Sequence, residues 1–276
     1  MELTRMASLC PTAAVGDGAT RGVSDRLASG EYARKQIYCP SRVVAWSHRS
    51  RFRLAARLAT GGAGGRLLDY GCGDGTFMLL TLGRFAEAVG ADLDSAEFAE
   101  CRRRLGGLPG LTFLRTADLV GPRQRRIYDV VTCMEVLEHC VDAERVRVLE
   151  HLHGLVAARG RVVISVPIEI GPALAGKQLF RALAAWQGQG DYRHRETYSP
   201  RELMNATFGR PGLARARYEL RTASGPMAAC GHKGFDWRIL QKEIMARFAV
   251  ERRLFTPLGR IGPLLNSQVW FVCVPR

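Results

Sequence analysis

The sequence lacks the long apolar runs and paired cysteines that mark several protein classes. No apolar run in its 276 residues reaches the roughly eighteen residues needed to span a bilayer. None of its eight cysteines forms a CxxC pair, and several lie inside apolar runs, as expected in a reducing compartment. The N-terminus has no unbroken apolar segment of the kind found in secretory signals. We therefore expect a cytoplasmic protein without a membrane span.

Acidic residues are scarce: 26 Asp and Glu stand against 40 Lys and Arg, which gives a formal net charge of +14. Such a charge is compatible with a nucleic-acid or anionic-lipid partner. The arginines, however, are spread along the chain in short groups such as Arg102–Arg104, without a basic stripe interleaved with aromatic residues. Nucleic acid is therefore a compatible partner but not the favoured one.

The sequence pattern divides the chain into regions. Residues 1–30 are rich in small and polar residues without a sustained period, so we expect a flexible leader. The remainder, 31–276, fits one domain by length. We expect it to contain a core at 64–167, a cap at 168–247 and closing antiparallel strands at 248–276.

Short apolar segments alternate with helical patterns through the core, which predicts right-handed βαβ units. The expected fold class is α/β, with a Rossmann-like, mainly parallel seven-stranded sheet that has helices on both faces. The expected strands are 66–70, 88–93, 111–115, 128–133, 160–166, 250–255 and 267–274. The expected helices of the core and its approach are 38–58, 76–86, 95–105 and 141–157.

Residues 168–247 are too many for a normal connection, so we expect a helical cap inserted after the fifth strand. Its helices are predicted at 174–186, 200–208 and 236–248. Ser199 is the expected N-cap of the second of these, with Pro200 as the first helical residue.

A glycine-rich turn, Asp69–Gly75, follows the first strand, where open α/β sheets bind their ligands. The next two strands are followed by Asp92 and Asp118, which can accept hydrogen bonds from ribose hydroxyls and an exocyclic amino group. Acidic side chains at Asp69 and Asp74 would repel a pyrophosphate but suit a cationic sulfonium with its amino-acid tail. The turn therefore favours S-adenosylmethionine (SAM) over NAD.

Three runs, Leu67–Phe77, Val89–Asp94 and Tyr128–His139, resemble the successive motifs of class I SAM-dependent methyltransferases in order and spacing. This resemblance covers roughly residues 64–167. It implies that the glycine turn holds the methionine part of SAM, Asp92 the ribose and Asp118 the adenine. The cofactor-binding residues expected on this basis are Asp69, Gly71, Cys72, Gly73, Asp74, Gly75, Asp92, Leu93, Asp118, Leu119, Cys133 and Met134.

Glu135, Glu138 and His139 have the i, i+3, i+4 spacing that places three donors on one face of a helix, where they suit a divalent metal ion. The run is similar to one in ubiquinone-pathway O-methyltransferases and in bacterial small-RNA end 2′-O-methyltransferases, where it can carry a metal. Methyltransferases without metal carry such a run as well. The alternative is therefore that these side chains cap a helix or orient the substrate.

Candidate catalytic residues are His139, His194 and His232, of which the last two lie in the expected cap. The alternative for a lone loop histidine is a surface position without contact to substrate. SAM carries its own electrophile, so a base is needed only if the acceptor must lose a proton.

The sequence thus predicts an enzyme that transfers the methyl group of SAM to a small-molecule acceptor at oxygen, nitrogen or an activated carbon. A 2′-O RNA methyltransferase is the alternative within enzymes, and a non-catalytic scaffold that keeps the SAM fold is the alternative of another class. The acceptor and the oligomeric state are not specified by the sequence.

Overall fold

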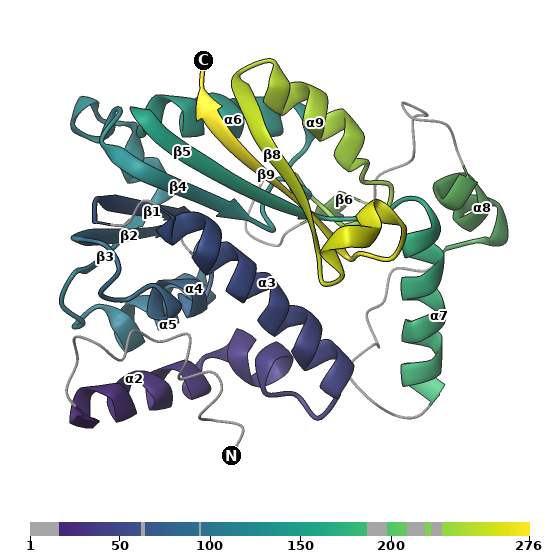
Figure 1. The fold of residues 1–276 in the computed structure, drawn as a ribbon, viewed down its shortest axis with the longest axis horizontal. Helices are drawn as coiled ribbons and strands as arrows, with labels where there is room; N and C mark the ends of the chain where they lie inside the picture. Colours follow the sequence, from purple (N-terminus) through teal and green to yellow (C-terminus); the bar gives the residue numbers. More distant parts are fainter. Residues whose placement is uncertain (1–16, 62–63, 94, 187–197, 209–218, 222–227) are drawn as a thin grey trace. The chain divides into compact units, whose positions relative to one another are not determined.

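The computed structural model describes residues 17–61, 64–93, 95–186, 198–208, 219–221 and 228–276 (Figure 1). Its main sheet has seven strands in the order β3-β2-β1-β4-β5-β9-β8. The strands are β1 (Arg66–Tyr70), β2 (Glu87–Asp92), β3 (Leu111–Arg115), β4 (Tyr128–Met134), β5 (Val156–Pro167), β8 (Phe248–Thr256) and β9 (Gln268–Pro275). The pairs β1–β2, β1–β4 and β2–β3 are parallel, and an antiparallel hairpin closes one edge, so the predicted mainly parallel Rossmann-like sheet is confirmed.

The described helices are mainly α-helices, with one short π-helix and three short 3-10 helices between them. The longer ones are α2 (Asp17–Ser29), α3 (Arg42–Thr60), α4 (Thr76–Leu80), α5 (Ala96–Leu105), α6 (Asp142–Leu155), α7 (Pro172–Trp186), α8 (Pro200–Phe208) and α9 (Trp237–Met245). The π-helix η1 covers Ala33–Ile37. None of the helices within the described ranges is long and apolar enough to cross a membrane.

Two compact units divide the chain. The first unit comprises Met1–Cys133 and Gly154–Val163 with Pro275, and the second comprises Met134–His153 and Ile164–Val274 with Arg276. The first unit therefore contains β1, β2, β3 and the helices α2 to α5, whereas the second contains α7, α8, α9, β8 and most of β9.

Local signals in the sequence account for the helix boundaries. Ser95 caps α5 by accepting a hydrogen bond from the backbone N–H of Phe98, 3.1 Å away. Ser199 and Glu202 form a reciprocal capping box at the start of α8, since each side chain accepts from the other's backbone N–H. The predicted start of this helix at Ser199 and Pro200 is confirmed.

The second half of the segment expected to be a flexible leader contains a helix. Residues Asp17–Ser29 form α2, and this helix buries Val23 and Leu27. Two apolar side chains spaced by four residues lie on the same face of a helix, and their burial ties α2 to the fold of the first unit. Residues 1–16 lie outside the described part of the chain.

Helix α4 is shorter than predicted, because it ends at Leu80 rather than near residue 86. The hydroxyl of Thr81 donates to the backbone carbonyls of Phe77 and Met78, and Gly83 takes a positive φ of 73°. Both features favour a turn over another helical turn. A small antiparallel pair, β6 (Glu219–Arg221) with β7 (Ala228–Cys230), was not predicted.

Candidate functional site

The glycine turn of the first unit leaves β1 in a sharp reversal. The backbone N–H groups of Gly71 and Cys72 both donate to the carbonyl of Ala91 at the end of β2, at 2.7 and 3.1 Å. Gly73 and Gly75 have φ values of 52° and 75°, in the left-handed region that favours glycine. The turn is therefore hydrogen-bonded to the neighbouring strand, and its glycines adopt the backbone conformations that the reversal requires.

These two glycines differ in their surroundings. A Cβ atom on Gly75 would lie 2.5 Å from Cδ1 of Leu105 and 2.7 Å from Sγ of Cys101, so Gly75 is required by packing against α5. A Cβ atom on Gly73 would meet only Oε1 of Glu97, at 3.5 Å. The backbone at Gly73 is therefore open on its outer side, as expected where a ligand approaches the turn.

Asp69 is the last but one residue of β1 and the first residue of the turn, and it is only 1% exposed. Its Oδ1 accepts a hydrogen bond of 2.7 Å from the hydroxyl of Thr132 on β4. Burial raises the pKa of Asp69 to about 7, and the nearby charge of Asp92 adds to this effect. A carboxylate in this state gains most when a cation binds nearby, because the cation stabilises its ionised form.

Asp92 ends β2 and supports the turn through both carboxylate oxygens. One oxygen accepts from the backbone N–H of Gly73 at 2.6 Å, and the other accepts from the N–H of Leu93 at 2.7 Å. Burial raises the pKa of Asp92, and these two hydrogen bonds oppose that shift. Each ionised oxygen has more than one acceptor direction, so Asp92 retains the capacity to accept from two ribose hydroxyls.

Glu97 is a further acidic residue at the turn, and it was not among the site residues predicted from the sequence. It lies in the first turn of α5, and its pKa is raised, first by burial and then by the charges of Asp74 and Asp92. The turn is thus surrounded by carboxylates, which matches a cationic ligand and opposes a pyrophosphate. An acidic residue just after the N-cap Ser95 was the available signal in the sequence.

Asp74 connects the turn to the N-terminal helices. Its carboxylate accepts from the backbone N–H of Tyr32 and of Thr76, both at 3.0 Å, and lies 3.7 Å from the guanidinium of Arg104. Arg104 also donates to the backbone carbonyls of Asp74 and Arg26. The charge of Asp74 is therefore paired within the first unit, and its structural role is to hold residues 26–32 against the turn.

The other cofactor-binding residues expected from the sequence have varied surroundings. The carboxylate of Asp118 is 43% exposed and pairs with Arg115, which keeps its pKa below the ordinary range. Leu119 and Cys133 are buried, Leu93 is exposed and Met134 is partly buried.

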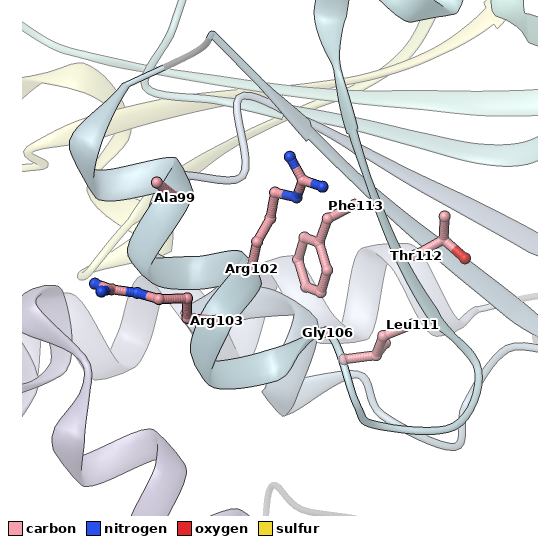
Figure 2. Close-up of a pocket in the computed structure, with 7 residues that line it drawn as sticks. All are labelled: Ala99, Arg102, Arg103, Gly106, Leu111, Thr112 and Phe113. Carbon is pink, nitrogen blue, oxygen red and sulfur yellow. The ribbon is translucent and has the colours of Figure 1, made fainter.

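A cavity of about 650 Å³ lies between α5 and the edge strand β3 (Figure 2). Figure 2 shows Arg102 and Arg103 projecting from α5 in different directions at this cavity. Its lining contains no residue of the glycine turn, and two arginines would repel a sulfonium. We therefore do not place the cofactor in this cavity.

In the second unit, the segment from Glu135 to His139 is a turn rather than the predicted helix. Glu135 has a positive φ of 58°, and helix α6 begins only at Asp142. The carboxylate of Glu135 accepts a hydrogen bond from the side-chain amide of Gln268 on β9. The assumption that Glu135, Glu138 and His139 share one helical face is therefore wrong.

The turn instead brings Glu138 and His139 together with His232. One potential ligand atom from each of these side chains lies within 4.8 Å of the other two. The Nε2 atoms of the two histidines are 3.4 Å apart, and Glu138 is fully buried. We call these three residues the Glu-His-His cluster.

Two of the three candidate catalytic histidines, His139 and His232, thus lie side by side although they are 93 residues apart in sequence. The third candidate, His194, lies outside the described residues. His139 is anchored to β7, because its Nδ1 is 2.9 Å from the carbonyl of Cys230 and its own carbonyl accepts from the N–H of Cys230 at 2.7 Å.

Comparisons with known proteins place the chain in a family. A family model described as a methyltransferase domain matches residues 45–208, which is more than half of the chain. Among curated proteins, the ubiquinone biosynthesis O-methyltransferase of Pseudomonas aeruginosa is 34% identical over 105 residues, which is 37% of this chain and 44% of that protein. The enzyme of the same name from Aeromonas salmonicida is 32% identical over 144 residues, or 51% and 59%. The chain therefore spans less than two thirds of the length of these relatives.

Solved structures show the same fold. The PH0226 protein from Pyrococcus horikoshii matches with a TM-score of 0.58 at 14% identity, over 90% of this chain and 98% of that one. The N-methyltransferase NodS from Bradyrhizobium japonicum, in complex with S-adenosyl-L-homocysteine, matches with a TM-score of 0.52 at 11% identity, over 92% and 97%. With the sheet order, the acidic glycine turn and the match of the family model, the chain belongs to the methyltransferase domain family.

Proposed function

We propose that the chain binds SAM at the glycine turn of its first unit and transfers the methyl group to an acceptor. The observation that carries this proposal is the turn itself, where an open glycine backbone at Gly73 is surrounded by Asp69, Asp92 and Glu97. In this proposal the turn and Asp69 hold the methionine part, Asp92 accepts from the ribose hydroxyls, and Asp118 accepts from the adenine amino group. The protein contributes binding and orientation, since the sulfonium is already an electrophile.

The acceptor in our proposal is a hydroxyl oxygen of a small molecule. The Glu-His-His cluster supports oxygen, because a hydroxyl becomes a good nucleophile only as it loses its proton. The name of the curated relatives, ubiquinone biosynthesis O-methyltransferase, agrees with this choice. An amine that is already neutral would not have to lose a proton before transfer, so a nitrogen acceptor of this kind would gain less from the cluster.

The donor set of the cluster fits a divalent metal ion. Two imidazole nitrogens and one carboxylate form a set known from catalytic zinc and iron sites that leave positions open for a substrate. Two nitrogens bound at 2.0–2.1 Å in tetrahedral geometry lie about 3.3 Å apart, close to the 3.4 Å between the two Nε2 atoms. Such an ion would polarise the acceptor hydroxyl and lower its pKa. Glu138, His139 and His232 would hold it.

The direct test offers purified protein and methyl-labelled SAM to phenols, catechols, amines, activated-methylene compounds and a short RNA, before and after chelation with restoration by Mg²⁺, Mn²⁺ or Zn²⁺. We expect label on a small-molecule oxygen, loss of transfer after chelation and recovery with one of the ions. Label on RNA alone would favour the 2′-O RNA alternative. SAM binding without transfer to any acceptor would favour the scaffold.

Two matched variants identify the carboxylate that belongs to the cluster. Glu138→Gln is expected to lower metal affinity at least about tenfold, the lower end of the range known for weakening a metal site. Glu135→Gln is the control, because Glu135 binds Gln268 and is not part of the cluster. Equal losses in both variants would contradict the assignment of Glu138.

A further inference from the structure

His232 has a carboxylate on the opposite side of its ring from the cluster. Its Nδ1 lies 3.8 Å from Oε1 of Glu169, which follows β5 by two residues. This separation is longer than a hydrogen bond but short enough for a small rotation of the ring, or one bridging water molecule, to complete the contact. The side chain of His232 is 34% exposed and that of Glu169 only 2%.

Lys177 on α7 fixes Glu169 in this position. Its ammonium donates to Oε1 of Glu169 and to the backbone carbonyl of Ile168, both at 2.9 Å. A buried carboxylate is costly unless it is paired and hydrogen-bonded, and Lys177 supplies both forms of compensation. Lys177 therefore holds the carboxylate of Glu169 in place beside the ring of His232.

His139 shows the matching arrangement on the other side of the cluster. The carbonyl of Cys230 can only accept, so the Nδ1 of His139 that faces it at 2.9 Å must carry the proton. The Nε2 of His139 then presents a lone pair toward His232. A backbone carbonyl thus sets the tautomer of one histidine of the pair.

We infer that Glu169 is a positioning residue that fixes His232 as the Nδ1–H tautomer, so that the Nε2 lone pairs of both histidines and the Glu138 carboxylate converge on one divalent cation. This inference rests on the cluster of the proposed function and adds Glu169 and Lys177 to it. In the metal-free protein, Glu169 has to outweigh the repulsion between two lone pairs that face each other at 3.4 Å, and a cation bound between them removes that repulsion. The competing arrangement has His232 as the Nε2–H tautomer, donating directly to His139.

The tautomers are measurable without any activity assay. Long-range proton–nitrogen NMR spectra of the metal-free protein, at a pH where both rings are neutral, distinguish the Nδ1–H from the Nε2–H form of each histidine. We expect the Nδ1–H form for both His139 and His232. The Nε2–H form of His232 in the unmodified protein would overturn the inference.

Variants connect this tautomer to Glu169. Replacing the pair together, Glu169→Leu with Lys177→Met, avoids leaving either charge buried alone, and such replacements are often tolerated. This double variant is expected to shift His232 toward the Nε2–H form and to weaken Co²⁺ binding, followed by its visible absorption, by about ten- to a hundredfold. Glu169→Gln retains an acceptor oxygen and is expected to restore the tautomer.

The matched control removes another ion pair of the second unit, Arg145 with Glu243, whose atoms are 2.6 and 2.7 Å apart. Arg145→Met with Glu243→Leu is expected to change neither the tautomer nor Co²⁺ affinity. If the Glu169 and Lys177 double variant also changes neither, the inference is wrong. If the tautomer shifts as expected but the unmodified protein binds no Co²⁺, the metal of the proposed function is contradicted while the role of Glu169 in setting the tautomer stands.

Discussion

At the scale of single residues, the burial of Asp69 affects both the stability of the fold and the role that we propose for this residue in SAM binding. Its carboxylate is buried at the glycine turn, and burial raises its pKa to about 7. The ordinary value is 3.8, so the folded protein holds the proton more tightly than the unfolded chain does. Asp69 therefore contributes stability that is fully present below its unfolded pKa and is lost as the pH rises through about 7.

The variant Asp69→Asn separates the effect of the Asp69 carboxyl group on SAM affinity from its effect on stability. Because SAM favours the ionised carboxylate, its affinity for the unmodified protein is expected to fall as the pH drops below about 7, by up to about tenfold per pH unit. The variant should bind SAM more weakly at pH 8, by roughly ten- to a hundredfold for one lost charge-assisted interaction, and its affinity should not change with pH in this range. Without SAM, it should be more thermally stable than the unmodified protein at pH 8.

Calorimetric titration and thermal unfolding at about pH 6 and about pH 8 measure both effects. A SAM affinity that falls with pH equally in the variant and in the unmodified protein would show that another group is responsible.

At the same scale, Gly73 and Gly75 allow a paired prediction. Gly75→Ala places a methyl group against Leu105 and Cys101 at a positive φ, so we expect unfolding to become easier by about 2–4 kcal/mol from overpacking and strain. Gly73→Ala has the φ strain but no close neighbour, so its stability loss should be about 1–2 kcal/mol. Its SAM affinity should fall, because the added methyl group covers the open side of the turn.

Urea unfolding and SAM titration of the two variants provide the comparison. If Gly73→Ala binds SAM as tightly as the unmodified protein, the open side of Gly73 is not where the cofactor approaches.

At the scale of elements, the sequence predicted the helix and strand boundaries that are determined by neighbouring residues. The bounds of β1, β3 and α8 agree with the prediction, because apolar runs and the capping box at Ser199 define them within a few residues. The length of α4 was not predictable in the same way, since it depends on the hydroxyl of Thr81 bonding back to the preceding turn. The short strands β6 and β7 carry too few residues to show a period.

In the candidate site, too, the sequence indicated the features that depend on neighbouring residues and missed a contact between distant ones. Asp69 and Asp92 could be proposed as site residues from the sequence because they lie in the last two residues of β1 and at the end of β2. The sequence grouped Glu135, Glu138 and His139 by helical spacing, whereas Glu135 adopts a left-handed turn and the structure groups His232 with Glu138 and His139. His232 and His139 are 93 residues apart in sequence, so the spacing of neighbouring residues could not predict their contact.

At the scale of the whole molecule, the two features that we propose to bind ligands belong to different units. The first unit contains the acidic glycine turn, which we assign to SAM, and the second contains the Glu-His-His cluster, which we assign to the acceptor. The cluster begins four residues after β4 ends, so one continuous stretch of chain joins the sheet to it. We propose that α7 and α8, which follow β5, form the cap over the acceptor.

Calorimetric titration of the purified protein with SAM and with NAD tests whether the glycine turn binds SAM. We expect micromolar binding of SAM, no response to NAD, and an affinity for SAM that is weaker by roughly ten- to several-hundredfold in Asp92→Ala, from the loss of charge-assisted hydrogen bonds. Binding of NAD, or an unchanged affinity for SAM in Asp92→Ala, would show that the turn does not bind SAM as proposed.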